Sequence, residues 1–207
     1  MINDFQTLSA AVANWLARAD LATVIPDLIQ LAETRIMFGG TIGAEYIPGL
    51  RVRQMHQTVS GNATDGVIAL PADFLEVHQL LVPSGCSDPE LRPVPLEGPN
   101  TIRTGLPRGY AVIGSNLHIV GGPGDAAYTL TYYAKIPPLS QGQNWLILEN
   151  PALYLHATLL EAAPYLKADQ RIAVWAAQFK ADMDGMRAAD QRSRFGPGVR
   201  MRMRDAP

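Results

Sequence analysis

Helical periodicity at both ends of the chain, with strand periodicity between them, constrains the fold more than any other feature. Apolar residues recur at helical spacing over residues 5–16, and the same spacing returns over residues 172–186. Such spacing places apolar side chains on one face of a helix. The intervening residues include YAVIGSNLHIV and AAYTLTYYAKIP, which are rich in β-branched and aromatic residues and predict strands. Neither group of helices can close a core alone, so we expect the two groups to pack together.

The fold class predicted from this order is α+β. We expect a helical bundle formed by the N- and C-terminal helices, an inserted antiparallel β-domain and an extended C-terminal arm. The predicted limits are residues 1–46 and 141–195 for the helical domain, 47–140 for the β-domain and 196–207 for the arm.

Capping residues and helix breakers predict where the first two helices begin and end. Asn3 or Asp4 can cap a helix that runs to about Arg18. The second helix has Pro26 in its first turn and ends at the Gly39-Gly40 pair.

The later helices carry similar signals. Helical structure is expected to return at Asn144 or Asn150, and Pro164 ends or kinks that segment. Asp169 is expected to cap the last helix, which runs to about Arg192. Its predicted apolar stripe consists of Ile172, Trp175, Ala176, Phe179, Met183 and Met186.

The β-domain begins after a predicted loop at residues 41–49. From Leu50 the residues alternate with period two, which predicts a strand. Residues 66–82 read as strand, turn and strand around Pro71. The Pro- and Gly-rich residues 84–106 are expected to form turns or a projecting loop.

Charge is scarce and unevenly distributed. Charged residues make up 17% of the chain, which suggests that partner chains cover much of its surface. From Arg187 onward the net charge is +4, whereas residues 1–186 carry −6. A basic end on an acidic body is directed at an acidic target, either nucleic acid or a protein surface.

Cysteine content and hydropathy favour a soluble cytoplasmic protein without disulfides or membrane spans. Cys86 is the only cysteine, and no apolar run reaches the length needed to cross a bilayer. The first residues, MINDFQTLSA, do not have the pattern of a signal peptide.

No motif predicts catalysis, a cofactor or a metal. His56, His78, His118 and His156 lack zinc-site spacing. The GGPGD stretch at 121–125 lacks the Lys-Ser/Thr of a phosphate loop and is expected to be a turn between strands.

Two further groups have competing interpretations. Tyr128, Tyr132 and Tyr133 could stack nucleic-acid bases, but cross-strand packing is favoured because only Lys135 supplies a nearby positive charge. Asp182 and Asp184 lie two residues apart on a predicted helix, so they do not face each other as an acid–base pair would.

Arginines supply the candidate binding residues. Arg51 and Arg53 are either a solvated face or partners in salt bridges across a subunit boundary. After Phe195 and a Gly-Pro-Gly hinge, arginine alternates with apolar residues over 199–204. An extended segment with this pattern would present Val and Met on one side and Arg on the other. The alternatives for this segment are a disordered end or a nucleic-acid-binding module that uses the arginines.

Several segments in their order along the chain resemble the head-to-tail adaptor proteins of tailed bacteriophages, of the tail tubular protein A or gatekeeper type. The segments that carry the resemblance are NWLARADL, IPDLIQLAETRI, LRVRQM, GVIALPADFLEVHQL, YTLTYYAKIPPLS and NWLILENPALYLHATLLEAAPYL.

The resemblance implies a structural virion protein, made in the host cytoplasm, that is not an enzyme. Its partners would be the portal protein, a tail or nozzle protein, and further copies of itself in a dodecameric ring through which DNA passes without sequence-specific binding. It also implies that a C-terminal segment docks on the portal. The residues of that segment here are Arg194, Phe195, Val199, Arg200, Met201, Arg202, Met203 and Arg204.

Overall fold

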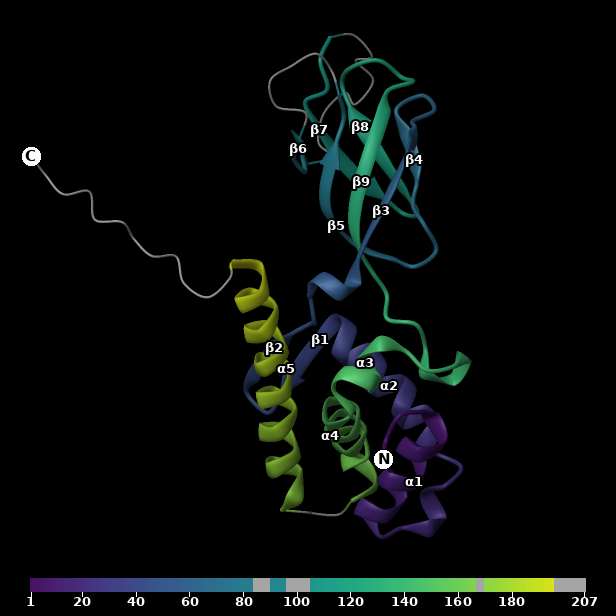
Figure 1. Cartoon of the computed structure of the whole chain (residues 1–207), viewed down its shortest axis with the longest axis vertical. Helices are drawn as coiled ribbons and strands as arrows, with labels where there is room; N and C mark the ends of the chain where they lie inside the picture. The colour runs from purple at the N-terminus through teal and green to yellow at the C-terminus, as the bar shows by residue number, and fades with distance from the viewer. Residues whose placement is uncertain (84–89, 96–104, 167–169, 196–207) are drawn as a thin grey trace, which may run out of the picture. The chain divides into compact units, whose positions relative to one another are not determined.

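The computed structural model describes residues 1–83, 90–95, 105–166 and 170–195. Unit 1 comprises Met1–Gln54 together with the chain from Ile136 onward, and unit 2 comprises Met55–Lys135. Unit 1 is built mainly from helices and unit 2 from antiparallel strands (Figure 1). The predicted α+β class, with β-sheets inserted between helices that pack together, is confirmed. The predicted domain limits remain predictions.

The helices of unit 1 begin at the residues that the capping signals indicate. The α-helices are α1 Phe5–Leu16, α2 Ile25–Phe38, α3 Trp145–Glu149, α4 Pro151–Glu161 and α5 Arg171–Phe195. Short 3₁₀ turns are η1 Ala19–Leu21, η2 Arg53–Met55, η3 Leu139–Gln141 and η4 Ala163–Tyr165. The predicted cap at Asp169 lies outside the described residues.

Side-chain caps explain the starts of α1, α3 and α4. Asp4 and Thr7 form a capping box, in which Thr7 N–H donates to Asp4 Oδ1 at 2.7 Å and Asp4 N–H donates to Thr7 Oγ1 at 3.1 Å. Asn144 and Asn150 accept the backbone N–H of Ile147 and Leu153, respectively. Both asparagines are therefore caps, which splits the predicted helical segment into α3 and α4.

The core of unit 1 surrounds α4, which packs against α1, α2 and α5. Trp175, Phe179 and Met183 of the predicted α5 stripe are buried, whereas its other three members are half-buried. Burial of these large side chains stabilises the fold by about 25 cal/mol for each Å² of apolar surface that is removed from water. The helical prediction for the last segment is confirmed, and α5 continues to Phe195.

The predicted loop at residues 41–49 is wrong, because β1 (Gly39–Ile42) and β2 (Glu45–Pro48) form an antiparallel hairpin. The turn uses Gly43, whose φ of 61° favours glycine. Gly39 at the end of α2 has φ 77°, and a Cβ there would collide with the Ile47 carbonyl oxygen. The strands are too short for their periodicity to stand out in the sequence.

The predicted strand start at Leu50 is also wrong. Strand β3 begins at His56, and residues 53–55 form the η2 turn. Leu50 and Val52 are both buried, which accounts for the apparent alternation at the start of this segment without a ladder of hydrogen bonds.

Unit 2 contains two antiparallel sheets, with strand orders β3-β9-β5-β6 and β4-β8-β7. The strands are β3 His56–Asn62, β4 Val67–Ala69, β5 Phe74–Leu81, β6 Glu90–Leu91, β7 Gly109–Ile113, β8 Asn116–Val120 and β9 Ala127–Ala134. One apolar cluster joins Leu80 and Leu130 of the first sheet to Leu117 and Ile119 of the second. The sheets therefore share one core.

The turn predictions in unit 2 are confirmed where the structure describes them. Strands β4 and β5 flank Pro71, and β7 and β8 form the predicted hairpin. Residues 121–125 connect β8 to β9 as a turn. Within 84–106, Glu90–Leu91 forms strand β6, and the segments 84–89 and 96–104 lie outside the described residues.

Candidate functional site

The last turns of α5 carry the first of the predicted docking residues. Arg194 Nε lies 2.7 Å from Asp190 Oδ2, in a pair whose aspartate side chain is only 7% exposed. Asp190 Oδ1 also accepts the backbone N–H of Arg53 at 2.9 Å. Phe195 is the last residue of α5. The other predicted docking residues lie outside the described part of the chain: Val199, Arg200, Met201, Arg202, Met203 and Arg204.

The two arginines predicted at a subunit boundary have different surroundings. Arg51 Nη1 donates to the carbonyl oxygens of Met37 and Leu50 at 2.8 and 2.7 Å. It thereby satisfies a carbonyl in the last turn of α2 and stabilises its own chain. Arg53 is exposed and lines a cleft beside α5. Of the two, Arg53 has the side chain that another subunit can reach more easily.

The α5 cleft, about 330 Å³ in volume, is lined by α5 and by residues 53–54 and 149–150. Its floor is open because Ala181, Gly185 and Ala189 follow one another at four-residue steps, and a Cβ added at Gly185 meets no atom within 4 Å.

The carboxylates around the α5 cleft all have partners. Asp190 pairs with Arg194, and Asp182 Oδ2 lies 2.7 Å from His156 Nδ1 on α4. Glu149 accepts a hydrogen bond from Gln54 Nε2 at 3.2 Å. These contacts join α5 to α4 and to the segment before β3. The polar side chains that line the cleft therefore hold its walls together.

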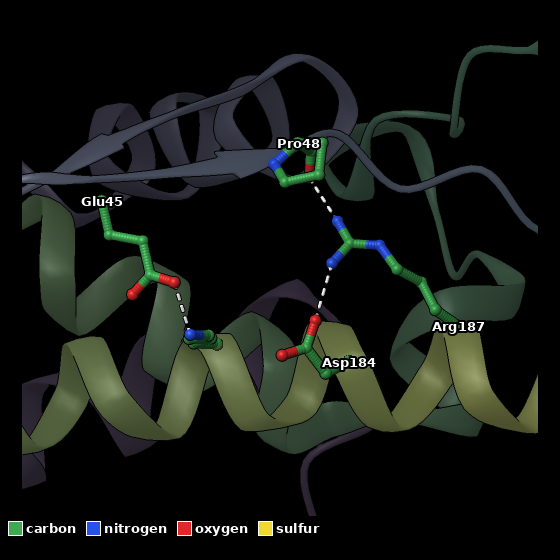
Figure 2. A network of polar contacts seen from close by, with 5 residues as sticks. Glu45, Pro48, Asp184 and Arg187 are labelled. Atoms are coloured by element: carbon green, nitrogen blue, oxygen red, sulfur yellow. Dashed lines mark hydrogen bonds and ion pairs between the residues drawn. The ribbon is translucent and has the colours of Figure 1, made fainter.

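A second polar network ties α5 to the hairpin that the sequence did not reveal. Lys180 pairs with Glu45. Figure 2 shows Arg187 donating both to the Pro48 carbonyl oxygen and to Asp184. The hydrogen bond that Lys180 donates to Glu45 raises the pKa of Lys180. Each ion pair has at least one side chain that is more than half exposed, so each contributes little to stability on its own. Together they fix the hairpin along one side of α5.

A buried carboxylate lies on α2, where sequence reasoning did not single it out. Glu33 is 8% exposed, and its Oε1 accepts the Leu139 backbone N–H at 2.7 Å and the Tyr154 hydroxyl at 3.3 Å. Asn144 Nδ2 donates to the same hydroxyl oxygen at 2.7 Å. Burial raises the pKa of Glu33, and burial beside this carboxylate raises the pKa of Tyr154. The network links α2, η3 and α4.

The aromatic residues of unit 2 pack on one another. Tyr132 is buried, and its hydroxyl donates to Asp73 at 3.0 Å; burial and this contact raise its pKa to about 12. The His56 and His78 rings lie 4.3 Å apart, with the Tyr133 ring edge-on to both. Cross-strand packing accounts for these contacts.

Within residues 1–83, 90–95, 105–166 and 170–195, no three His, Cys, Asp or Glu side chains gather in a way that could hold a metal ion. No helix of the described chain is long and apolar enough to cross a membrane.

Leu31 and Phe38 of α2 are large apolar side chains that are exposed. Comparison with protein families identifies the class of protein. Residues 3–202 match the SU10 adaptor protein family, and the chain belongs to this family. It is a phage adaptor family with a structural rather than catalytic role. No curated protein matches the chain.

Proposed function

We propose that this protein is the head-to-tail adaptor of a phage virion. Its copies form a dodecameric ring below the portal, join the portal to a tail or nozzle protein, and line the channel through which DNA leaves the capsid. The observation that carries this proposal is the family match over residues 3–202, which includes both units and reaches into the arginine-rich segment.

The charge distribution supports the same function. The net charge of −6 over residues 1–186 suits a channel wall that does not hold DNA, because each phosphate contact adds salt-dependent affinity. The scarcity of charge suits a subunit with extensive contacts to its neighbours.

Residues 194–204 are the proposed portal-docking segment. Arg194 is already paired with Asp190 at the end of α5, so it orients the segment, and the residues after Phe195 make the new contacts. An extended segment of alternating residues can bind a partner through backbone hydrogen bonds and alternate side chains. Arg53, at the α5 cleft, is the proposed contact with a neighbouring subunit.

Electron microscopy of the purified chain mixed with its portal protein tests this function. We expect rings on the portal with the full chain and bare portals when residues 196–207 are deleted. Circular dichroism of the deletion variant should match that of the full chain, since α5 ends before the deletion. A full chain that leaves the portal bare would contradict the proposal.

A nucleic-acid-binding module is the alternative, favoured by the net charge of +4 from Arg187 onward. It requires an affinity for DNA that falls steeply with salt and disappears when residues 196–207 are deleted. A filter-binding titration at several salt concentrations separates the two functions, because the adaptor has no need of tight DNA binding.

A further inference from the structure

A second cavity in unit 1, about 460 Å³ in volume, has a carboxylate at its base and is here called the Glu33 cavity. It lies between α2, the start of α1 and the η3 turn. Its lining residues are Phe5, Pro26, Asp27, Ile29, Gln30, Glu33, Thr34, Met37, Pro138, Ser140 and Gln141.

Glu33 has an oxygen available to this cavity. Both hydrogen bonds that Glu33 accepts go to Oε1, from Leu139 N–H and the Tyr154 hydroxyl. Among the described residues, none donates to Oε2. Oε2 is not among the buried atoms that lack a partner, so it faces the water of the cavity, where a cation or a donor can reach it. The two hydrogen bonds to Oε1 hold the Glu33 side chain in place. Neither of them comes from a positively charged group.

The lining of the Glu33 cavity is suited to a positively charged side chain. Asp27 adds a second carboxylate at the exposed edge, and no lysine or arginine is among the described lining residues. Apolar side chains, including Ile29 and Met37, provide walls for an aliphatic stem. A guanidinium at the end of such a stem offers several N–H donors to a carboxylate in a fixed geometry.

The chain itself supplies side chains of this kind. Residues 196–207 follow α5 and contain Arg200, Arg202 and Arg204. In Figure 1 the end of α5 lies away from α1, which is one of the elements that line the cavity. In a closed ring with head-to-tail contacts, each subunit binds its neighbour through two different surfaces. Here the C-terminal arginines would be one surface and the Glu33 cavity the other.

We propose that the Glu33 cavity receives an arginine side chain from residues 196–207 of a neighbouring copy of this chain. This inference rests on the proposed ring and identifies one of its contacts between subunits. One arginine of the segment then binds the neighbouring subunit, and the remaining proposed docking residues contact the portal.

A binding experiment with the full chain tests the proposal. The probe is a fluorescent peptide with the sequence of residues 194–207, and binding is followed by anisotropy at a chain concentration below that of self-association. Glu33→Gln should weaken binding by about tenfold or more, because it removes the negative charge that pairs with the arginine. Glu149→Gln, which changes a carboxylate at the α5 cleft, is the matched control and should leave binding unchanged.

A second variant keeps the test valid if Glu33→Gln disturbs the fold. Gln30 is exposed and lines the cavity, so Gln30→Arg places a competing guanidinium beside Glu33 and should also weaken peptide binding. A peptide in which the three arginines after Phe195 are replaced by glutamine should bind the unaltered chain weakly. Together these results would assign binding to both the cavity and the arginines.

Three results would overturn the proposal. The first is no measurable binding of the peptide to the unaltered chain. The second is equal binding to the unaltered, Glu33→Gln and Gln30→Arg chains. The third is loss of portal attachment by Glu33→Gln without loss of peptide binding, which would assign the cavity to a portal side chain. Rings that form on the portal without any peptide binding would overturn this inference and leave the adaptor function standing.

Discussion

The α5 cleft and the Glu33 cavity are two hollows of the same unit, both lined with carboxylates, yet they differ in how those carboxylates are paired. Around the cleft, Asp190 has Arg194 and Asp182 has His156. In the cavity, Glu33 has two neutral donors on one oxygen and no cation among the described residues. The cleft carboxylates stabilise the fold through their pairs within the subunit, whereas the Glu33 carboxylate is available to a partner.

The largest expected effect is at the cleft. Asp190→Ala removes the ion pair to Arg194 and the acceptor for the Arg53 N–H, and should lower the free energy of unfolding by about 2–3 kcal/mol. Urea denaturation followed by circular dichroism measures this loss. Asp184→Ala, an exposed carboxylate on the same helix, is the control and should cost about 0.5 kcal/mol or less. Equal losses in the two variants would remove the distinction between buried and exposed pairs on α5.

The cavity should respond in the opposite direction. Glu33→Gln keeps an oxygen acceptor for Leu139 N–H but removes a buried charge, so the free energy of unfolding at neutral pH should rise by about 1 kcal/mol. Thermal and urea denaturation measure this difference. A clear loss of stability would mean that the charge of Glu33 serves the fold, as the cleft carboxylates do.

The pH dependence sharpens the same contrast. Since burial raises the pKa of Glu33, the folded chain keeps this proton at a pH where the unfolded chain, with a pKa near 4.5, has released it. Stability should therefore fall as the pH rises from about the unfolded pKa through the folded one. The difference in free energy of unfolding between Glu33→Gln and the unaltered chain, measured from acidic to neutral pH, should grow across this window. A difference that does not change with pH would contradict the raised pKa.

The smallest effect is expected from filling the cleft. A Cβ at Gly185 meets no atom, so Gly185→Ala should stabilise α5 by about 0.5 kcal/mol through the helix preference of alanine. Thermal denaturation measures the gain, and Ala181→Gly on the same face should give a loss of similar size. A loss from Gly185→Ala would mean that the backbone of α5 at this point needs glycine.

Periodicity predicted the long elements well, because an element that buries one face has apolar residues at regular spacing. The α5 stripe and the β7–β8 hairpin are examples. The β1–β2 hairpin was missed because its strands are short and its polar contacts are with α5, which is distant in the sequence.

Glu33 and Asp190 were missed for a related reason. A single acidic residue in a helix is usually solvated, and these two are buried by segments far along the chain. A signal was present nevertheless. Glu33 lies four residues after Ile29 and three before Ile36, and Asp190 lies four after Met186, so each acidic residue shares a helix face with apolar residues. The predicted docking residues after Phe195 remain a prediction.

The division of unit 1 between both ends of the chain has a consequence for the order of events during synthesis. Unit 2 is continuous from Met55 to Lys135, so all its strands have been made before α4 exists. The hydrogen bond from Leu139 to Glu33 spans 106 residues, and α2 packs on α4, which comes later still. Contacts of such long range form slowly. The emerging chain must therefore carry the uncovered apolar faces of α1 and α2 until the ribosome has completed α4.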